Sequence, residues 1–417
     1  MYASVHTDRN GRVFVSDDHR AAGSDGSSDV ALTATIALPA GARLVPLARD
    51  ALAFGRDGRM REIGRGRLAM AAILPRGYTR LLFPSYAEDP AAPALDALPY
   101  AAVGADREGE VVVAAAEHAP AVPGGGAHAS SRSELQAALR ARPANKLMRQ
   151  LTRCAREHEC AAAQAALAGQ GELPVPVGAR PAERPRLPLD LRSGYAGSPT
   201  ERAAIHPSAS EIAEMAGDAA ARGAARISFG RACDGEPLLA LRVVEDAVAR
   251  IRGSHPGIDL HLETSGSDAA GLRRLIEAGL SSVTVRLGAA TPETYRLLHG
   301  PIAHGWSDVR ASLHVAAARG IRPTVALLVL PGVTDRAVEI DAIVALLGEL
   351  PGGKLELRDL GADPARTLAA FPAAKPLGVR ILLDRVAEAD HFRLDGLGGE
   401  AASASRGGPR PAAGSPR

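Results

Sequence analysis

The residues best suited to bind a small ligand form a short run, Cys233-Asp234-Gly235-Glu236-Pro237, directly after an apolar stretch over residues 225–230. Glycine lets a backbone approach a ligand closely, and the Glu236 carboxylate can accept hydrogen bonds from a ligand ammonium group. Pro237 is also well placed for the first turn of a helix, so the run is equally typical of an ordinary turn before a helix. Gly235, Glu236 and Pro237 are therefore candidate cofactor-binding residues, with a structural turn as the alternative.

The number of cysteines limits the metal and redox sites that the chain can form. The chain has three cysteines, Cys154, Cys160 and Cys233, which excludes a disulfide framework and a four-cysteine zinc site and leaves thiolates for one iron–sulfur cluster at most. Cys154 and Cys160 are six positions apart in a predicted helix, so they point in different directions, and Cys233 follows a predicted strand. The histidines form no metal-binding motif. We predict no metal ligands and inert, buried thiols, with a Cys154–Cys160 redox pair as the alternative.

The elements that must position these residues alternate between strands and helices. Ser208 with Glu211 and Thr291 with Pro292 are typical helix starts. Strands are predicted over residues 225–230, 260–264, 282–287, 323–331, 354–360 and 379–384, and helices over residues 208–222, 268–279, 291–298, 307–319 and 335–350. The strands are almost continuously apolar, as in a parallel sheet buried on both faces. Serial units of this kind predict an α/β fold with a full or partial (β/α) barrel.

Composition changes divide the chain into five predicted segments. Residues 1–30 are polar and predicted to be disordered, and residues 31–118 contain short strands that predict a β-rich N-terminal domain. Residues 119–182 combine a Gly/Pro/Ser-rich linker with a helical segment that is interrupted near Pro143. Residues 183–397 carry the predicted barrel, and the low-complexity tail over residues 398–417 is predicted to be disordered.

Charge and composition narrow the range of partners. The formal net charge is +2 and aromatic residues make up 3% of the chain, so neither a basic footprint nor stacking platforms for nucleic acid are expected. No apolar run is long enough to span a membrane and the first residues lack a hydrophobic signal core. We therefore expect a cytoplasmic protein that binds a small molecule or a protein, and neither nucleic acid nor a membrane. Only Lys146, Lys354 and Lys375 among the 49 basic residues are lysines, which is typical of a GC-rich bacterial genome.

The order and spacing of several motifs resemble the radical S-adenosylmethionine (SAM) superfamily, and within it a bacterial group. The resemblance covers about residues 31–370. Its motifs are Ser228-Phe229-Gly230 with Cys233 and Gly235-Glu236-Pro237-Leu238, then residues 331–335 (PGVTD), then Arg358-Asp359-Leu360 with Asp363-Pro364. Matches in the N-terminal block are residues 36–39, 74–80, 98–100 and 102–104. The resemblance implies a partial (β/α) barrel whose Gly-Glu-Pro motif follows the second strand, with SAM and a [4Fe–4S] cluster as cofactors.

One departure from this pattern concerns the cluster itself. The family binds its [4Fe–4S] cluster through C-x₃-C-x₂-C after the first barrel strand, which here is predicted over residues 188–191. Leu191, Tyr195 and Ser198 stand at the three cysteine positions, and none of them replaces a thiolate ligand. Polar positions at the barrel mouth have also changed, at residues 263–266, 284–289 and 326. The resemblance therefore implies a pseudoenzyme with a binding or scaffold role, and it leaves open that SAM or a nucleotide is still bound near Gly235 and Glu236.

Two other functions remain open from the sequence, and no catalytic residue is assigned. An active radical SAM enzyme could use a rearranged cluster that includes Cys233. A barrel enzyme could instead use acid–base chemistry through Glu236, Asp234 or Glu263.

Overall fold

The computed structural model describes residues 2–75, 77–89, 91–96, 98–118, 132–157, 160–169, 171–178, 205–230, 235–300, 303–361, 363–389 and 393–395. Several predicted features lie outside these residues, namely the three positions of the cluster motif, the strand predicted over residues 188–191, Cys233, Asp234 and the predicted C-terminal tail. Within the described residues, no helix combines the length and the apolar character needed to cross a membrane.

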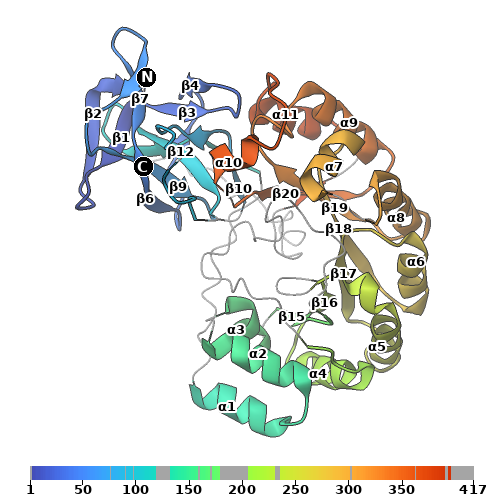
Figure 1. Cartoon of the computed structure of the whole chain (residues 1–417). Helices are drawn as coiled ribbons and strands as arrows, with labels where there is room; N and C mark the ends of the chain where they lie inside the picture. The colour runs from blue at the N-terminus through green and yellow to red at the C-terminus, as the bar shows by residue number, and fades with distance from the viewer. Residues whose placement is uncertain are drawn as a thin grey trace, which may run out of the picture.

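A seven-stranded parallel sheet forms the centre of the fold, and its strands are neighbours in chain order. They are β15 (Glu172–Val175), β16 (Arg226–Phe229), β17 (Asp259–Thr264), β18 (Ser282–Gly288), β19 (Thr324–Val329), β20 (Lys354–Asp359) and β21 (Arg393–Asp395). In the described residues the order begins at β15 and ends at β21 without pairing these two strands, so the barrel is partial. Helices line the outer, convex side of the curved sheet (Figure 1). The predicted α/β fold with a partial barrel is confirmed.

Side chains alternate strictly across this sheet. Leu260 and Leu262 on β17 and Val283 and Val285 on β18 pack into the main hydrophobic core with the outer helices. Because successive residues of a strand face opposite sides, His261, Glu263, Thr284 and Arg286 face the inner side. The strands are buried on both faces, as expected, but they are not all continuously apolar, because the inner positions of β17, β18 and β20 carry polar and charged side chains.

The outer helices begin and end close to where their capping signals predict. They are α4 (Ala209–Ala221), α5 (Leu241–Ser254) after the short 3₁₀ helix η1 (Pro237–Ala240), α6 (Ala269–Ala278), α7 (Pro292–His299), α8 (Trp306–Ala318), α9 (Ala337–Gly348), α10 (Pro364–Leu368) and α11 (Val379–Glu388). Ser208 and Glu211 form the predicted capping box of α4, and the Thr291 side chain caps α7. Gly279 ends α6 in the left-handed conformation with φ +118°, which glycine adopts without a steric penalty.

Two predictions at the ends of the barrel were wrong. The segment over residues 379–384, predicted as a strand, lies in helix α11, whose buried residues Val379, Leu382, Leu383 and Val386 have helical spacing. At the other end, β15 pairs with β16, so the parallel sheet begins before residue 183, in the segment that was assigned to the linker and helices.

Three helices precede β15, namely α1 (Arg132–Ala141), α2 (Lys146–Glu157) and α3 (Ala161–Leu167). The predicted interruption near Pro143 is confirmed, because α1 ends at Ala141 and α2 starts at Lys146. Leu147, Met148 and Leu151 of α2 are buried in the same core as α4. The helical segment therefore continues the core of the barrel.

The N-terminal region is β-rich, as predicted, and the structure corrects its start. Its strands are β1 (Ala3–Thr7), β2 (Val13–Arg20), β3 (Ala22–Ser24), β4 (Asp29–Ala31), β5 (Ile36–Ala37), β6 (Arg43–Asp50), β7 (Leu52–Gly55), β8 (Met60–Glu62), β9 (Leu68–Ile73), β10 (Tyr78–Arg80), β11 (Phe83–Pro84), β12 (Tyr100–Ala105), β13 (Val111–Val113) and β14 (Ala115–Glu117). Nine of them form one sheet. Residues 1–30, predicted to be disordered, supply β1, which pairs with β2, β9 and β12. Burial of Val5 and its neighbours through these distant pairings outweighs the polar composition.

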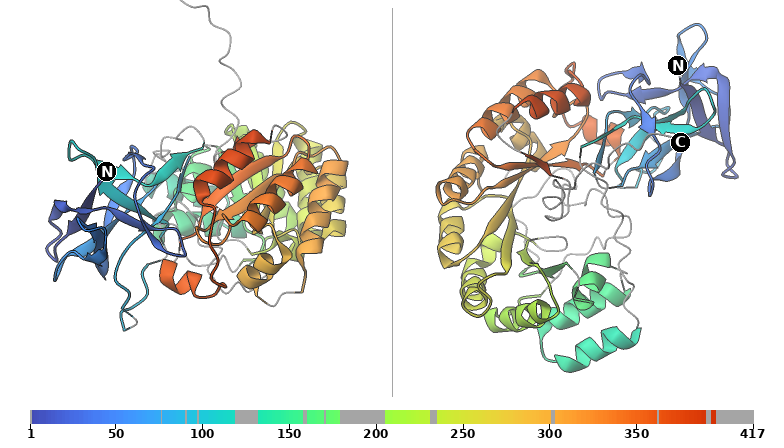
Figure 2. Two further views of the ribbon diagram at one scale, coloured as in Figure 1. Left: turned by 90° about the horizontal axis from the view of Figure 1, so that it is seen from above. Right: turned by 180° about the vertical axis from the view of Figure 1, so that it is seen from behind.

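The N-terminal strands lie beside the C-terminal part of the barrel (Figure 2), and a buried arginine on β10, which contacts β20, joins the two regions there. Arg80 has 0% exposed surface, and its guanidinium donates to the carbonyls of Tyr100 and Leu360. Asp359, the last residue of β20, accepts from Thr79 Oγ1 at 2.5 Å and from the Arg80 backbone N–H at 3.1 Å. The two regions are thus held together by polar groups that are withdrawn from water.

Candidate functional site

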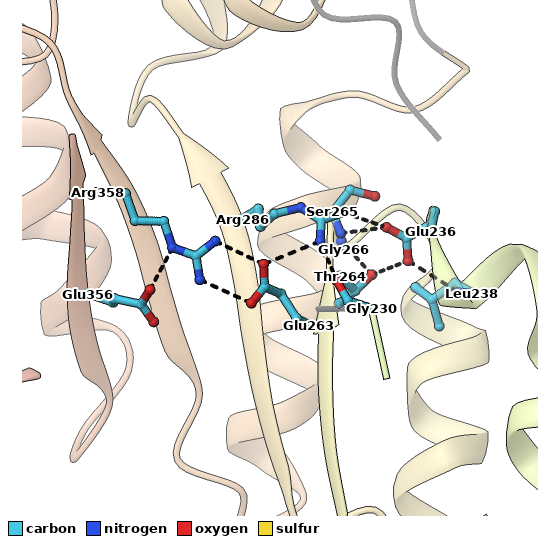
Figure 3. Close-up of polar contacts among 10 residues, drawn as sticks. All are labelled: Gly230, Glu236, Leu238, Glu263, Thr264, Ser265, Gly266, Arg286, Glu356 and Arg358. Atoms are coloured by element: carbon cyan, nitrogen blue, oxygen red, sulfur yellow. Dashed lines mark hydrogen bonds and ion pairs between the residues drawn. The ribbon is translucent and has the colours of Figure 1, made fainter. Parts of the chain in front are cut away.

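Five charged side chains form a row across the carboxyl ends of the parallel strands (Figure 3). In order along the row they are Glu356, Arg358, Glu263, Arg286 and Glu236, and each touches the next. They come from β20, β17, β18 and the loop that follows β16. We call this set the charged row. In α/β folds of this kind, ligands bind at the carboxyl ends of the strands, so the charged row occupies the expected position of a binding site.

Arg358 is held by two carboxylates. Its Nη1 and Nη2 lie 2.8 and 3.1 Å from Oε1 and Oε2 of Glu263, and its Nε lies 2.6 Å from Oε1 of Glu356. Burial by itself would lower the pKa of Arg358, but the charges of Glu263 and Glu356 outweigh burial and raise it above its ordinary value. The forked contact with Glu263 is the geometry in which guanidinium and carboxylate groups bind most strongly.

Arg286 connects the two remaining carboxylates. Its Nη1 lies 3.5 Å from Oε1 of Glu263, and its Nη2 lies 3.3 Å from Oε2 of Glu236. Nη1 also donates to the carbonyl of Gly230 at 3.4 Å. Glu263 therefore contacts a guanidinium on each side, and Glu236 contacts one.

The candidate residue Glu236 is fully buried and engaged by donors of the protein. Its Oε1 accepts from Thr264 Oγ1 at 2.5 Å and from the Leu238 backbone N–H at 3.2 Å. Its Oε2 accepts from the Ser265 backbone N–H at 2.7 Å and faces Arg286. A carboxylate offers about four acceptor positions, so these contacts occupy its capacity. The predicted role of Glu236 toward a ligand ammonium stays a prediction, and in this structure it anchors the loop after β16 to the end of β17.

The other two candidate residues fix the path of the same loop. The Gly235 N–H donates to the carbonyl of Gly178, beyond β15, at 2.6 Å. Pro237 opens the 3₁₀ helix η1, for which Glu236 is the N-cap. Gly230, at the end of β16, has φ +81°, and a Cβ built there would lie 1.9 Å from the Glu263 carbonyl oxygen and 2.8 Å from Pro237 Cγ. This close approach requires glycine.

Two buried hydroxyls lie at the same edge of the sheet. Ser228, on β16, and Ser265, just after β17, have 0% exposed surface. Their Oγ atoms have no hydrogen-bond partner among the residues that the structure describes. Buried polar groups are normally satisfied, so these hydroxyls are the groups here that a polar ligand would best satisfy.

Sequence reasoning named Glu236 and Glu263, but it gave no role to Arg286, Arg358 or Glu356. A signal was present. Charged residues recur at every second position in residues 354–358, and Glu263 and Arg286 follow polar residues two positions earlier. This period-two pattern indicates strands with one polar face, and it predicts which side chains share that face. It does not predict which charge pairs with which.

The described cysteines are not arranged as cluster ligands. Cys154 in α2 and Cys160 just before α3 are free, buried thiols of the main core, and the Cys154 sulfur accepts from Gln150 Nε2 at 3.2 Å. Among the described residues, no group of three or more His, Cys, Asp or Glu side chains could hold a metal ion. The whole segment between β15 and α4, residues 176–208, contains no cysteine. This donor set does not fit a [4Fe–4S] cluster, which needs thiolates.

Residues 190–342 match the family model of the radical SAM superfamily. This segment is a radical SAM domain. It extends from the segment before α4 into α9 and includes β16 to β19, the Gly235-Glu236-Pro237 motif and three residues of the charged row. The resemblance stated from the motifs is confirmed.

Solved structures with a similar fold include methylornithine synthase, with 12% identity, a TM-score of 0.36, and coverage of 62% of this chain and 73% of that chain. The radical SAM methyltransferase TsrM from Kitasatospora setae has 18% identity, a TM-score of 0.34, and coverage of 46% and 35%. SuiB from Streptococcus suis, solved with the precursor peptide SuiA, has 10% identity, a TM-score of 0.39, and coverage of 60% and 53%. No curated protein sequence matches the chain. At these identities the similarities carry no argument about the reaction, and the family assignment rests on the family model.

Proposed function

We propose that this radical SAM domain is a pseudoenzyme that acts by binding a small molecule or a protein, without the cluster-dependent radical reaction of its family. The observation that carries the proposal is the donor set. Leu191, Tyr195 and Ser198 stand where the family's cluster cysteines belong. Cys154 and Cys160, the described cysteines, are buried in the helical segment instead.

The charged row supports the same proposal, because its side chains neutralise one another. Arg286 and Arg358 are directed at carboxylates of the protein, and Glu236 and Glu263 are directed at guanidinium groups. Burying the carboxylates of Glu236, Glu263 and Glu356 costs several kcal/mol for each ion unless partners compensate. Satisfied pairs of this kind hold a fixed arrangement of strands, and none of their charges is left to act on a reacting group.

A retained binding role has support at the same edge. Ser228 and Ser265 offer buried hydroxyls, and the Gly235-Glu236-Pro237 segment holds a fixed loop beside them. These groups fit a polar ligand such as SAM or a nucleotide. The residues would bind and orient that ligand, and we derive no chemical step from it.

The contacts among the described residues do not support the two other candidate functions. For the rearranged cluster, Cys154 and Cys160 are embedded in the core, and Cys160 N–H donates to the Cys154 carbonyl at 3.1 Å. For acid–base chemistry, Glu236 and Glu263 both contact Arg286, and Glu263 also contacts Arg358, so both carboxylates are engaged in the ion pairs of the charged row.

Anaerobic reconstitution with iron and sulfide tests the proposal. The wild-type chain and a variant without cysteines, Cys154→Ser with Cys160→Ser and Cys233→Ser, should carry the same background iron and sulfide, and neither should cleave SAM when a reductant is added. Cluster-level iron and sulfide with SAM cleavage in the wild type would overturn the proposal. If Cys233→Ala alone then removed the iron, the rearranged cluster would be established instead.

Binding is measured separately. SAM and adenosine nucleotides are titrated into the wild-type protein and into Ser228→Ala and Ser265→Ala, with Ser307→Ala, an exposed serine at the start of α8, as the control. We expect the two buried serines, and not Ser307, to affect the binding of the ligand that the site accepts. If none of these ligands binds measurably, the binding of a protein remains as the role that we propose.

A further inference from the structure

Strand β2 of the N-terminal region has an edge that is not paired. On one side, residues 13–16 pair with β1 in regular register, which is interrupted between Ser16 and Arg20. On the other side, β7 reaches only His19 and Arg20, so among the described residues no strand pairs with this edge over residues 13–18. Figure 1 shows β2 on the side of the N-terminal region that faces away from the barrel. Such an edge offers backbone N–H and C=O groups to another strand.

The side chains along this edge alternate between its two faces. Val13 and Val15 are 46% and 42% exposed, and Asp17, on the same face, is also exposed. Phe14 and Ser16, on the opposite face, are half-buried. This period of two continues from Val13 to Asp17, as in a strand that can accept a neighbour. Free edges are usually protected by charged side chains, and here the valines stand in the middle of the edge while its charges stand at the ends.

The charges at the two ends of β2 are opposite in sign. At the beginning, the guanidinium carbons of Arg12 and Arg67 lie 5.2 and 4.3 Å from the centre of the Phe14 ring. No ion pair joins either arginine to a carboxylate of the residues that the structure describes. Asp17 and Asp18 stand near the other end of the strand, and both are exposed. The edge is therefore cationic at its beginning and acidic toward its end.

Within the chain, these charges have only weak or local partners. Asp18 pairs with Arg56 at 2.5 Å, but the two side chains are 68% and 81% exposed, and exposed pairs contribute little. Asp8, in the turn before β2, accepts from the backbone N–H groups of Asn10 and Arg12 through Oδ1. The charges at both ends are thus available to another molecule.

This distribution of charge selects one kind of partner. A second copy of β2 that runs antiparallel about a two-fold axis at Val15 places Arg12 opposite Asp18 of the second copy. It also places the two Val15 side chains opposite each other. A parallel copy would bring like charges together at both ends, and a strand of uniform charge would match only one end.

We propose that β2 is a dimerisation edge, at which two copies of this chain pair their β2 strands antiparallel around a two-fold axis. The pairing satisfies the backbone groups of the edge, covers Val15, and is held in register by the opposite charges at its ends. Because a strand edge buries less than a standard interface of about 1,600 Å², the dimer is weak and forms at high protein concentration. The inference concerns the N-terminal region and does not depend on the role proposed for the radical SAM domain.

Sedimentation velocity of the full chain over a roughly hundredfold range of concentration measures the dimer. We expect an equilibrium between monomer and dimer in the wild type. Val15→Lys should weaken the dimer about fivefold or more, because it places two ammonium groups opposite each other at the axis. Val338→Lys is the matched control, because Val338 is a 65% exposed valine on α9, and it should leave the equilibrium unchanged.

An exchange of charges tests the register. Arg12→Asp alone and Asp18→Arg alone should each weaken the dimer, because each places like charges opposite one another twice in a two-fold pair. The double variant that carries both changes should restore the dimer, since opposite charges then face each other again with their positions exchanged. A merely structural role of either residue would not produce this recovery.

Four results would overturn the proposal. They are a monomer at every concentration, a dimer that Val15→Lys does not weaken, an equal loss in Val338→Lys, which would indicate a general charge effect, and a double charge exchange that does not restore the dimer. Thermal unfolding of each variant verifies that it is folded. Should Val15→Lys unfold, hydrogen exchange of the wild type replaces it: the amides of residues 13–17 should exchange more slowly at high concentration, and equal rates at low and high concentration would contradict the proposal.

Discussion

A buried carboxyl group at the junction between the N-terminal region and the barrel predicts a strong dependence of stability on pH. Asp335 follows β19 and has 1% exposed surface. Its Oδ1 accepts from the Gly332 N–H at 2.7 Å, whereas its Oδ2 has no hydrogen-bond partner among the described residues. Burial and, to a smaller extent, nearby Asp25 raise the pKa of Asp335 to about 7, against the lowering effects of the Gly332 hydrogen bond and of Arg336.

The surroundings of Asp335 leave little room for relaxation. Gly26, in the turn between β3 and β4, packs directly on this loop, and a Cβ built at Gly26 would lie 2.2 Å from the Pro331 carbonyl oxygen. The Leu377 N–H donates to the backbone carbonyl of Asp335 at 3.0 Å. The carboxyl group is therefore enclosed by the N-terminal region on one side and by the segment before α11 on the other.

The size of the effect follows from the two pKa values. The ordinary pKa of an aspartate side chain is 3.8, and the pKa of Asp335 in the folded protein is about 7. Because the folded-state value is the higher one, the folded protein binds the proton more tightly, and stability falls as the pH rises. The loss is about 1.4 kcal/mol for each pH unit between about 4 and 7, or about 4 kcal/mol in all. Between pH 5 and pH 8 it amounts to about 3 kcal/mol.

Urea unfolding of the wild type and Asp335→Asn at pH 5 and pH 8 measures this contribution. The neutral amide cannot ionise, so the variant should lose about 3 kcal/mol less than the wild type between the two pH values. Asp341→Asn is the control, because Asp341 is exposed and pairs with Arg385 at 3.0 Å on the surface. Equal pH dependence in the wild type and in Asp335→Asn would refute the reasoning.

Two further predictions concern the junction and the cluster loop. Asp359→Ala should lower the free energy of unfolding by about 3–5 kcal/mol, because it leaves the fully buried Arg80 without its counter-charge. Denaturant unfolding measures this loss. A loss below about 1 kcal/mol, as for an exposed ion pair, would contradict the prediction. The triple variant Leu191→Cys, Tyr195→Cys and Ser198→Cys should allow one [4Fe–4S] cluster to be reconstituted in the radical SAM domain, because it supplies the missing thiolates. Iron and sulfide analysis with absorption spectroscopy measures the cluster. Iron at the level of the wild type would show that more than the cluster ligands has been lost.

Local signals account for the part of the fold that could be predicted from the sequence. Ser208 with Glu211 and Thr291 with Pro292 mark helix starts through contacts within three residues, so the structure agrees with them closely. The segment over residues 379–384 has no such signal, and a short apolar run is compatible with a strand and with a buried helix. It forms α11 because its apolar residues pack against α9, a tertiary effect.

The site was harder to predict, because its contacts depend on the register of the strands. The sequence indicates that Glu236 follows β16 and that Glu263 ends β17, but the pairing of these strands brings Thr264 and Ser265 to the Glu236 carboxylate. Residues far apart in the chain, such as Glu263 and Arg358, meet only once the sheet is assembled. The polar N-terminal strand β1 was missed for the same reason, since β9 and β12 bury it.

The charged row also has a consequence for the order in which the chain can fold during synthesis. Glu263 contacts Arg358, which lies 95 residues later, and until β20 has emerged from the ribosome and joined the sheet, Glu263 has only Arg286 as a partner of opposite charge in the row. A chain that stops after β19 therefore lacks the forked contact between Glu263 and Arg358. The charged row is complete only when β20 has joined the sheet, so it ties the end of β17 to a strand that is synthesised much later.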